Sequence, residues 1–180
     1  AMLQAMPDFK RTPGIDAPCV VSSPELFLAA PLASSLPAYC GTQPRVVCMS
    51  LLCDFDDESF MPEAKRIAEQ GVSNLILIVI FGESCGFHST EERAKQCMSA
   101  LGSIGWETAV VDGHNFSDME SAFGTLTYEE RSPKALFIAT RNASKFSFVR
   151  NANTKLQGCM SIEDMDQALE ELEGSDDGNE

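Results

Sequence analysis

The longest unbroken apolar stretch of the 180-residue chain is residues 75–81, LILIVIF. Seven apolar residues in a row leave no side of a strand for solvent, which is typical of parallel strands that are covered on both faces. The stretch is also far shorter than the roughly 20 residues needed to cross a bilayer. The sequence therefore predicts a buried central strand and no membrane insertion.

Segments of the same character recur along the chain and alternate with helical patterns. Strands are expected at 45–52, 74–81, 106–111 and 134–140. Helices are expected at 59–70, from a capping box at Ser89 and Glu92 to a stop at Gly102, from a second box at Ser117 and Glu120, and at 161–173. This alternation predicts an α/β fold: a mainly parallel sheet of four or five strands with helices on both faces.

An apolar segment at 26–38 needs a separate explanation. It resembles the core of a signal peptide, but Pro31 and Pro37 interrupt it and it begins too far from the first residue. Seven cysteines without a C-x-x-C pair fit reduced thiols in an intracellular compartment, with cytosol and organelle left open. Cys85 and His88 have the spacing of half a zinc site, but without two further ligands loop or core roles are favoured.

Charge is distributed unevenly. The chain has 27 Asp and Glu against 13 Lys and Arg, a net charge of −14, which argues against binding to nucleic acid. Nine of the acids lie in residues 156–180, where there is no Lys or Arg. We therefore expect an α/β domain over residues 1–155, followed by an acidic helix and tail over 156–180.

Four blocks of sequence resemble one known family in unbroken order from residue 9 to residue 151. Residues 108–123 (TAVVDGHNFSDMESAF) and 133–151 (PKALFIATRNASKFSFVRN) resemble the closing part of the transketolase diphosphate-binding domain. That domain has a strand ending in V-D-G-H-D and a later T-x-K-G-K-G-x-S-F-x-x-N loop. Residues 46–79 resemble its strand, G-D-G turn, helix and next strand, and 12–30 resemble its T-P-G segment. The resemblance implies a degenerate, single-domain form of this thiamine-diphosphate-binding fold.

The chain departs from the family at the cofactor site. The G-D-G turn reads Cys53-Asp54-Phe55, so a bulky ring replaces a glycine that permits close approach of a diphosphate. The family's metal-binding asparagine falls near Gly82, which has no side-chain oxygen, and Mg²⁺ needs near-octahedral oxygen ligation. His114 of the D-G-H turn is kept, as a structural signature. Asp54, Phe55, Gly82 and His114 are thus read as remnants, with no cofactor, metal or catalytic residue expected.

The family's active site also needs a second domain, for which this chain has no room. We therefore expect a non-catalytic protein, a structural or interaction subunit with protein partners in a larger assembly. One alternative is the diphosphate-binding subunit of a split thiamine-dependent transferase, which would bind thiamine diphosphate and Mg²⁺. Another is a small-ligand sensor that uses the vacated crevice.

Segments 19–25, 53–57 and 82–88 should converge at the carboxyl ends of the strands. The acidic cluster at 54–58 is read as helix capping rather than as a metal site. Arg141, Lys145 and Arg150, with the nearby phenylalanines, are read as an inherited loop rather than an anion site. The apolar side chains gained near the old site are expected to face a protein partner: Val20, Val21, Pro24, Phe55, Phe87, Phe146 and Phe148.

Overall fold

A computed structural model of the chain describes residues 14, 26–82, 90–125, 132–141 and 161–173. The chain divides into two compact units, Ala1–Thr140 and Arg141–Glu180. The boundary expected after residue 155 lies outside the described residues. Among the described residues, those of the first unit include the sheet and those of the second form a helix. Each is described by itself below.

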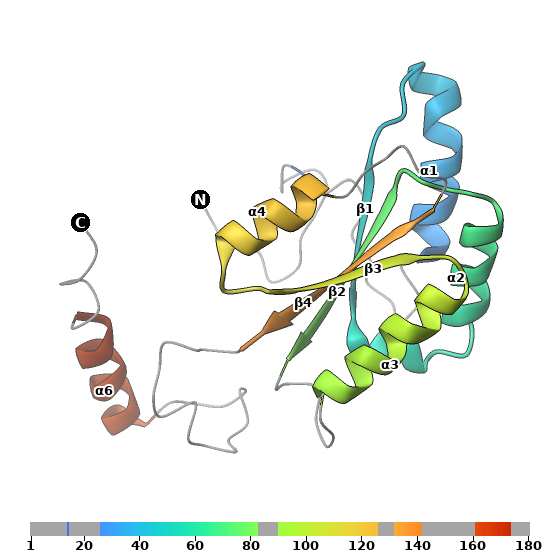
Figure 1. Cartoon of the computed structure of the whole chain (residues 1–180). Helices are drawn as coiled ribbons and strands as arrows, with labels where there is room; N and C mark the ends of the chain where they lie inside the picture. Colours follow the sequence, from blue (N-terminus) through green and yellow to red (C-terminus); the bar gives the residue numbers. More distant parts are fainter. Residues whose placement is uncertain (1–13, 15–25, 83–89, 126–131, 142–160, 174–180) are drawn as a thin grey trace. The chain divides into compact units, whose positions relative to one another are not determined.

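The first unit is built on a four-stranded sheet in which every pairing is parallel (Figure 1). The strands are β1 (Val46–Leu51), β2 (Leu75–Gly82), β3 (Glu107–Asp112) and β4 (Lys134–Thr140), in the spatial order β1-β2-β4-β3. The predicted α/β class, the four strands and the central place of the 75–81 run are confirmed. Met49, Ile78, Leu136 and Ala109 are register partners, so they lie on one face of the sheet.

The connections place helices on both faces, as predicted. The chain moves from β1 through α2 (Phe60–Glu69) to β2, and through α3 (Thr90–Ser103) over β4 to the edge strand β3. It then returns through α4 (Phe116–Thr125) to β4. Because crossovers are right-handed, the reversal of direction puts α4 on the face opposite α2 and α3 (Figure 1).

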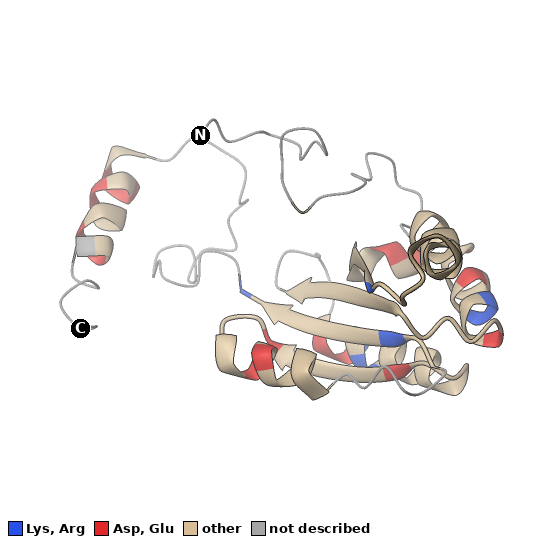
Figure 2. Cartoon of the chain, turned by 90° about the horizontal axis from the view of Figure 1, so that it is seen from above, with Lys and Arg blue, Asp and Glu red and all other residues tan. Residues whose placement is uncertain are grey.

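The core lies between the sheet and the helices that cover one of its faces. These are α2, α3 and the preceding helix α1 (Leu26–Cys40). Its side chains are mostly apolar, although Glu63 and Lys134 are buried as well. Figure 2 shows α1 and the middle of the strands free of charged residues. Trp106 joins α2 to the start of β3, because its indole Nε1 donates to the Ala64 carbonyl at 2.9 Å in a buried position. The largest fully buried apolar side chains are Phe60, Phe137, Leu26, Leu52, Ile67, Leu75, Ile76, Leu77, Leu101, Leu136 and Val79.

The sequence analysis did not predict α1, because Pro31 and Pro37 argue against a helix. Pro37 has no N–H for the carbonyl of Ala33, four residues earlier. That carbonyl instead accepts a hydrogen bond of 2.9 Å from Nδ2 of Asn74, which also donates to the Pro44 carbonyl at 2.9 Å. A buried amide from another part of the chain thus supplies the hydrogen bond that the proline removes.

Two helix ends differ from the sequence prediction. α4 begins at Phe116, and its cap is Asn115, whose Oδ1 accepts from the Asp118 amide at 3.2 Å; the expected cap, Ser117, lies inside the helix. α3 continues through Gly102 to Ser103, and the turn into β3 uses Gly105 with φ +96°. The prediction for α2 is confirmed to within a residue at each end, with Gly71 at φ +63° after it.

The second unit contains α6 (Ile162–Glu173), which matches the predicted helix at 161–173. Ser161 caps it, because its Oγ accepts from the Asp164 amide at 3.0 Å. None of the described helices has the combination of length and apolar content that a membrane span requires.

Two register partners in the sheet differ in burial, and substituting each of them gives a test of the core and its control. Ile78 is 7% exposed, whereas its register partner Met49 on the same face is 55% exposed. Ile78→Asp should unfold the isolated chain, because an unpaired buried carboxylate costs several kcal/mol. Met49→Asp should change the free energy of unfolding by about 1 kcal/mol or less, the span of strand propensities. Urea unfolding followed by circular dichroism measures both, and a native-like Ile78→Asp variant would contradict this account of the core.

Candidate functional site

The candidate site is the carboxyl edge of the sheet, where ligands bind in open α/β folds. The described residues there are the 3₁₀ turn η1 (Leu52–Asp56) after β1, Gly82 at the end of β2, the turn at Gly113 after β3, and Thr140 at the end of β4. β1 and β2 are neighbours, so the predicted approach of segment 53–57 to Gly82 agrees with the topology. Outside the described residues lie segments 19–25 and 83–88 and the predicted site residues Val20, Val21, Pro24, Cys85, Phe87, His88, Lys145, Phe146, Phe148 and Arg150.

Asp54 acts as a local cap in η1. One carboxylate oxygen, Oδ2, accepts from the Ser50 hydroxyl at 2.8 Å and from the Leu51 amide at 2.6 Å. The carboxylate therefore binds back to the end of β1 and fixes the direction in which the chain leaves the sheet. This agrees with the predicted capping role, although the capped element is the 3₁₀ turn rather than α2.

Phe55 packs on the core of its own unit. Its ring centroid lies 4.1 Å from that of Phe60 and 6.0 Å from that of Phe137, which in turn lies 6.5 Å from Phe81. Phe60, Phe81 and Phe137 are buried, and Phe55 is half-buried. Phe55, the last residue of the Cys53-Asp54-Phe55 turn, thus extends the core under η1. Its apolar character therefore has an explanation within this chain.

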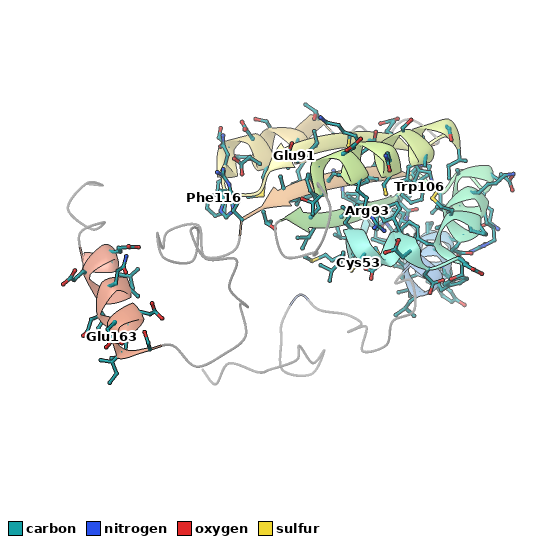
Figure 3. All side chains as sticks on the ribbon, turned by 90° about the horizontal axis from the view of Figure 1, so that it is seen from below. Cys53, Glu91, Arg93, Trp106, Phe116 and Glu163 are labelled. Atoms are coloured by element: carbon teal, nitrogen blue, oxygen red, sulfur yellow. The ribbon has the colours of Figure 1, made fainter. Side chains whose placement is uncertain are left out.

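The rest of the acidic cluster is held by separate partners. Asp56 forms an ion pair with Arg93 of α3, the arginine labelled in Figure 3, and this pair ties η1 to that helix. This contact raises the pKa of Arg93. Asp57 accepts hydrogen bonds from the hydroxyl and the amide of Ser59, and these lower its pKa. Among the residues that the structure describes, no group of three His, Cys, Asp or Glu is placed to hold a metal ion.

Gly82, at the end of β2, is the register partner of Thr140 at the end of β4. A Cβ atom at this position would overlap the carbonyl oxygen of Thr140 and crowd its hydroxyl. The same hydroxyl donates to the Phe81 carbonyl at 3.2 Å. In this backbone, position 82 has no room for any side chain, including an asparagine.

The D-G-H turn has a structural role that its geometry explains. The Gly113 amide donates to the Ala139 carbonyl at 2.8 Å, and a Cβ there would lie 2.7 Å from Cγ2 of Ile138. Oδ1 of Asp112 accepts from the amide of His114 at 2.9 Å, which closes the turn. Asp112 and Gly113 thereby hold the end of β3 against β4, and His114 is exposed.

The sequence analysis missed a cleft of about 640 Å³ beside η1, between α2 and α3. Its walls include Phe55, the Asp56–Arg93 ion pair and Cys97. Burial raises the pKa of the Cys97 thiol, so this group is not an activated nucleophile. No local motif marks the cleft, because its residues come from three separate elements.

Comparison with known proteins supports the fold. No protein-family model matches the chain, and no curated protein matches it. A transketolase from Campylobacter jejuni subsp. jejuni has a similar solved structure, with a TM-score of 0.54 and 13% sequence identity over 70% of this chain. The match spans only 20% of that transketolase. The fold is therefore transketolase-like, in agreement with the resemblance of the sequence blocks, and at this identity the likeness concerns the fold alone.

The contact between Gly82 and Thr140 predicts that position 82 tolerates no side chain. Gly82→Ala should lower the free energy of unfolding by about 3 kcal/mol, the upper range for overpacking, because the obstacle is backbone. The control is Gly102→Ala in α3, where a Cβ meets nothing within 4 Å and helix propensity favours alanine by up to about 1 kcal/mol. Thermal and urea unfolding compare the two variants. Equal stability of both would show that the strand ends can separate freely.

Proposed function

We propose that this chain is a non-catalytic, transketolase-like protein that serves as an interaction subunit of a larger assembly. The observation that carries the proposal is the outward face of β1, where Val47, Met49 and Leu51 are each about half exposed. A row of apolar side chains along a strand is unfavourable in water unless a partner covers it.

The outer side of α1 has the same character. This helix has no charged residue in its 15 positions, and Phe27, Leu28 and Leu32 remain exposed on it. A helix that is apolar on all sides is typical of a buried position. The two exposed apolar surfaces together support a working state in which partner proteins cover them.

Three features of the carboxyl edge support the loss of the cofactor site. Asp54 is engaged as a cap, Phe55 fills the turn from the core side, and position 82 has no space for a ligand side chain. A metal and a diphosphate would need the Asp54 carboxylate to be released from its cap, a smaller residue at position 55 and a side-chain oxygen at position 82. This is an argument from packing, and a binding measurement tests it.

Two alternatives make distinct predictions. As the diphosphate-binding subunit of a split transferase, the chain would use the Asp54 carboxylate for a metal and bind thiamine diphosphate with Mg²⁺. As a small-ligand sensor, it would use a crevice such as the cleft beside Phe55 and Cys97. Both alternatives require the chain to bind a small molecule, either alone or together with a second subunit. The interaction proposal requires no small-molecule ligand.

Calorimetric titration of the purified chain with thiamine diphosphate and Mg²⁺ should give no heat of binding. The reason is that the turn and the strand end that would hold the metal are occupied by this chain's own groups. The control is the same titration with Asp54→Ala. Micromolar binding that needs the metal and disappears in Asp54→Ala would overturn the non-catalytic proposal and favour the split transferase.

The face of β1 is tested in the native assembly. Met49→Asp, which should fold normally, is expected to reduce incorporation into that assembly by at least about tenfold, because it places a carboxylate in an apolar contact. Ser99→Asp, on an exposed site of α3, adds the same charge away from β1 and should incorporate normally. Affinity purification with quantitative mass spectrometry measures incorporation. The uncovered apolar face should also make the isolated chain self-associate, and sedimentation should show less of this for Met49→Asp. Normal incorporation of Met49→Asp would refute this interface.

A further inference from the structure

The helix α6 has one apolar stripe and otherwise consists almost entirely of acids. Ile162, Met165, Leu169 and Leu172 follow each other at intervals of three, four and three residues, so they share one face of the helix. All four are exposed, from 43% for Leu172 to 72% for Ile162. This is the spacing of a helix that binds in an apolar groove.

The charges lie on both sides of the stripe. Half of the twelve residues of α6 are Asp or Glu, and none is Lys or Arg (Figure 2). At 100° per residue, Asp166 borders the stripe on one side, and Asp164 and Glu171 border the Ala168 side. A groove that accepts the stripe therefore meets carboxylates along both of its edges.

The charge pattern also conflicts with the helix dipole at one end. Glu163 and Asp164 in the first turn favour the dipole and Ser161 caps the amino end, whereas Glu170 opposes the dipole near the carboxyl end and the last turn of α6 contains no base. A helix of 12 residues is marginal in water without tertiary contacts. Cations beside the last turn would remove this conflict, so a basic partner stabilises the helix as well as binding it.

We infer that α6 docks its Ile162, Met165, Leu169 and Leu172 stripe into an apolar groove rimmed by Lys and Arg on another protein. The chain's own first unit is a poor host, because Ala1–Thr140 carries 18 Asp and Glu against 9 Lys and Arg, a net charge of −9. A second copy of α6 is a poor host as well, since it brings six further acids and no base. Residues 141–155 of the second unit carry four Lys and Arg and no acid, yet the stripe is exposed, so charge complementarity selects a basic partner outside the chain. This contact does not depend on the proposed function, because β1 and α1 belong to the other unit.

The test uses the full chain and two designed helical peptides with the same Ile and Leu seam. One peptide carries Lys at the positions that flank the seam, and the other carries Glu there. Fluorescence anisotropy should show that the basic peptide binds, that the acidic one does not, and that added salt weakens binding. Met165→Ala together with Leu169→Ala should weaken binding by at least about tenfold, whereas Gln167→Ala, on the polar face, should leave it unchanged.

Four outcomes would overturn the inference. Equal binding of the two peptides, or equal binding by the double variant, would show that the stripe and its charged borders do not act together. Hydrogen exchange that already protects 162–173 in the free monomer, and loses this protection in the double variant, would place α6 on its own chain. Self-association that only the double variant abolishes would make a second copy the partner. Because Met49 lies outside α6, none of these results alters the test of the β1 face.

Discussion

The sheet depends on one strand that is buried on both of its faces. β2 pairs with β1 on one side and with β4 on the other, and residues 75–79 are all buried. Since a parallel strand cannot be joined to its neighbour by a tight turn, each connection must cross a face of the sheet, and it does so as a helix. Burial of this one strand therefore requires the layers on either side of it, and these layers account for the α/β class.

The close packing of the strand ends restricts what the carboxyl edge can do. Gly82 and Gly113 are positions where a side chain would meet the last residues of β4, so both glycines bring neighbouring strand ends together. At Phe55 of η1 the relation is reversed, since this residue adds a ring that packs on Phe60. The edge is thus optimised for contact within the chain. This packing supports the proposed loss of the cofactor site, because a diphosphate site needs backbone that is open toward solvent and side chains that leave space for oxygen atoms.

The sequence was sufficient for the parts of the fold that depend on local pattern. Continuous apolar runs predicted the four strands, and Asp54 was recognised as a capping residue. It was insufficient wherever a distant residue decides the outcome. Pro37 argues against a helix on local grounds, and only the fold shows that Asn74, 37 residues later, supplies the missing donor. Asn115 replaces Ser117 as a cap for a related reason, because the turn at Gly113 fixes where α4 can begin. The cleft beside Cys97 depends on three elements at once.

The two proposed contacts use different forces. The face of β1 and the outer side of α1 are uncharged, so their association would gain from removal of apolar surface from water and would depend little on salt. The stripe of α6 is apolar too, but its carboxylate borders act over several ångströms before contact, and opposite charges speed association more than they strengthen the final complex. An acidic helix that engages first and an apolar face that is covered afterwards form a consistent order of assembly. In that order the charged contact selects the partner, and the apolar contact gives the complex its lifetime.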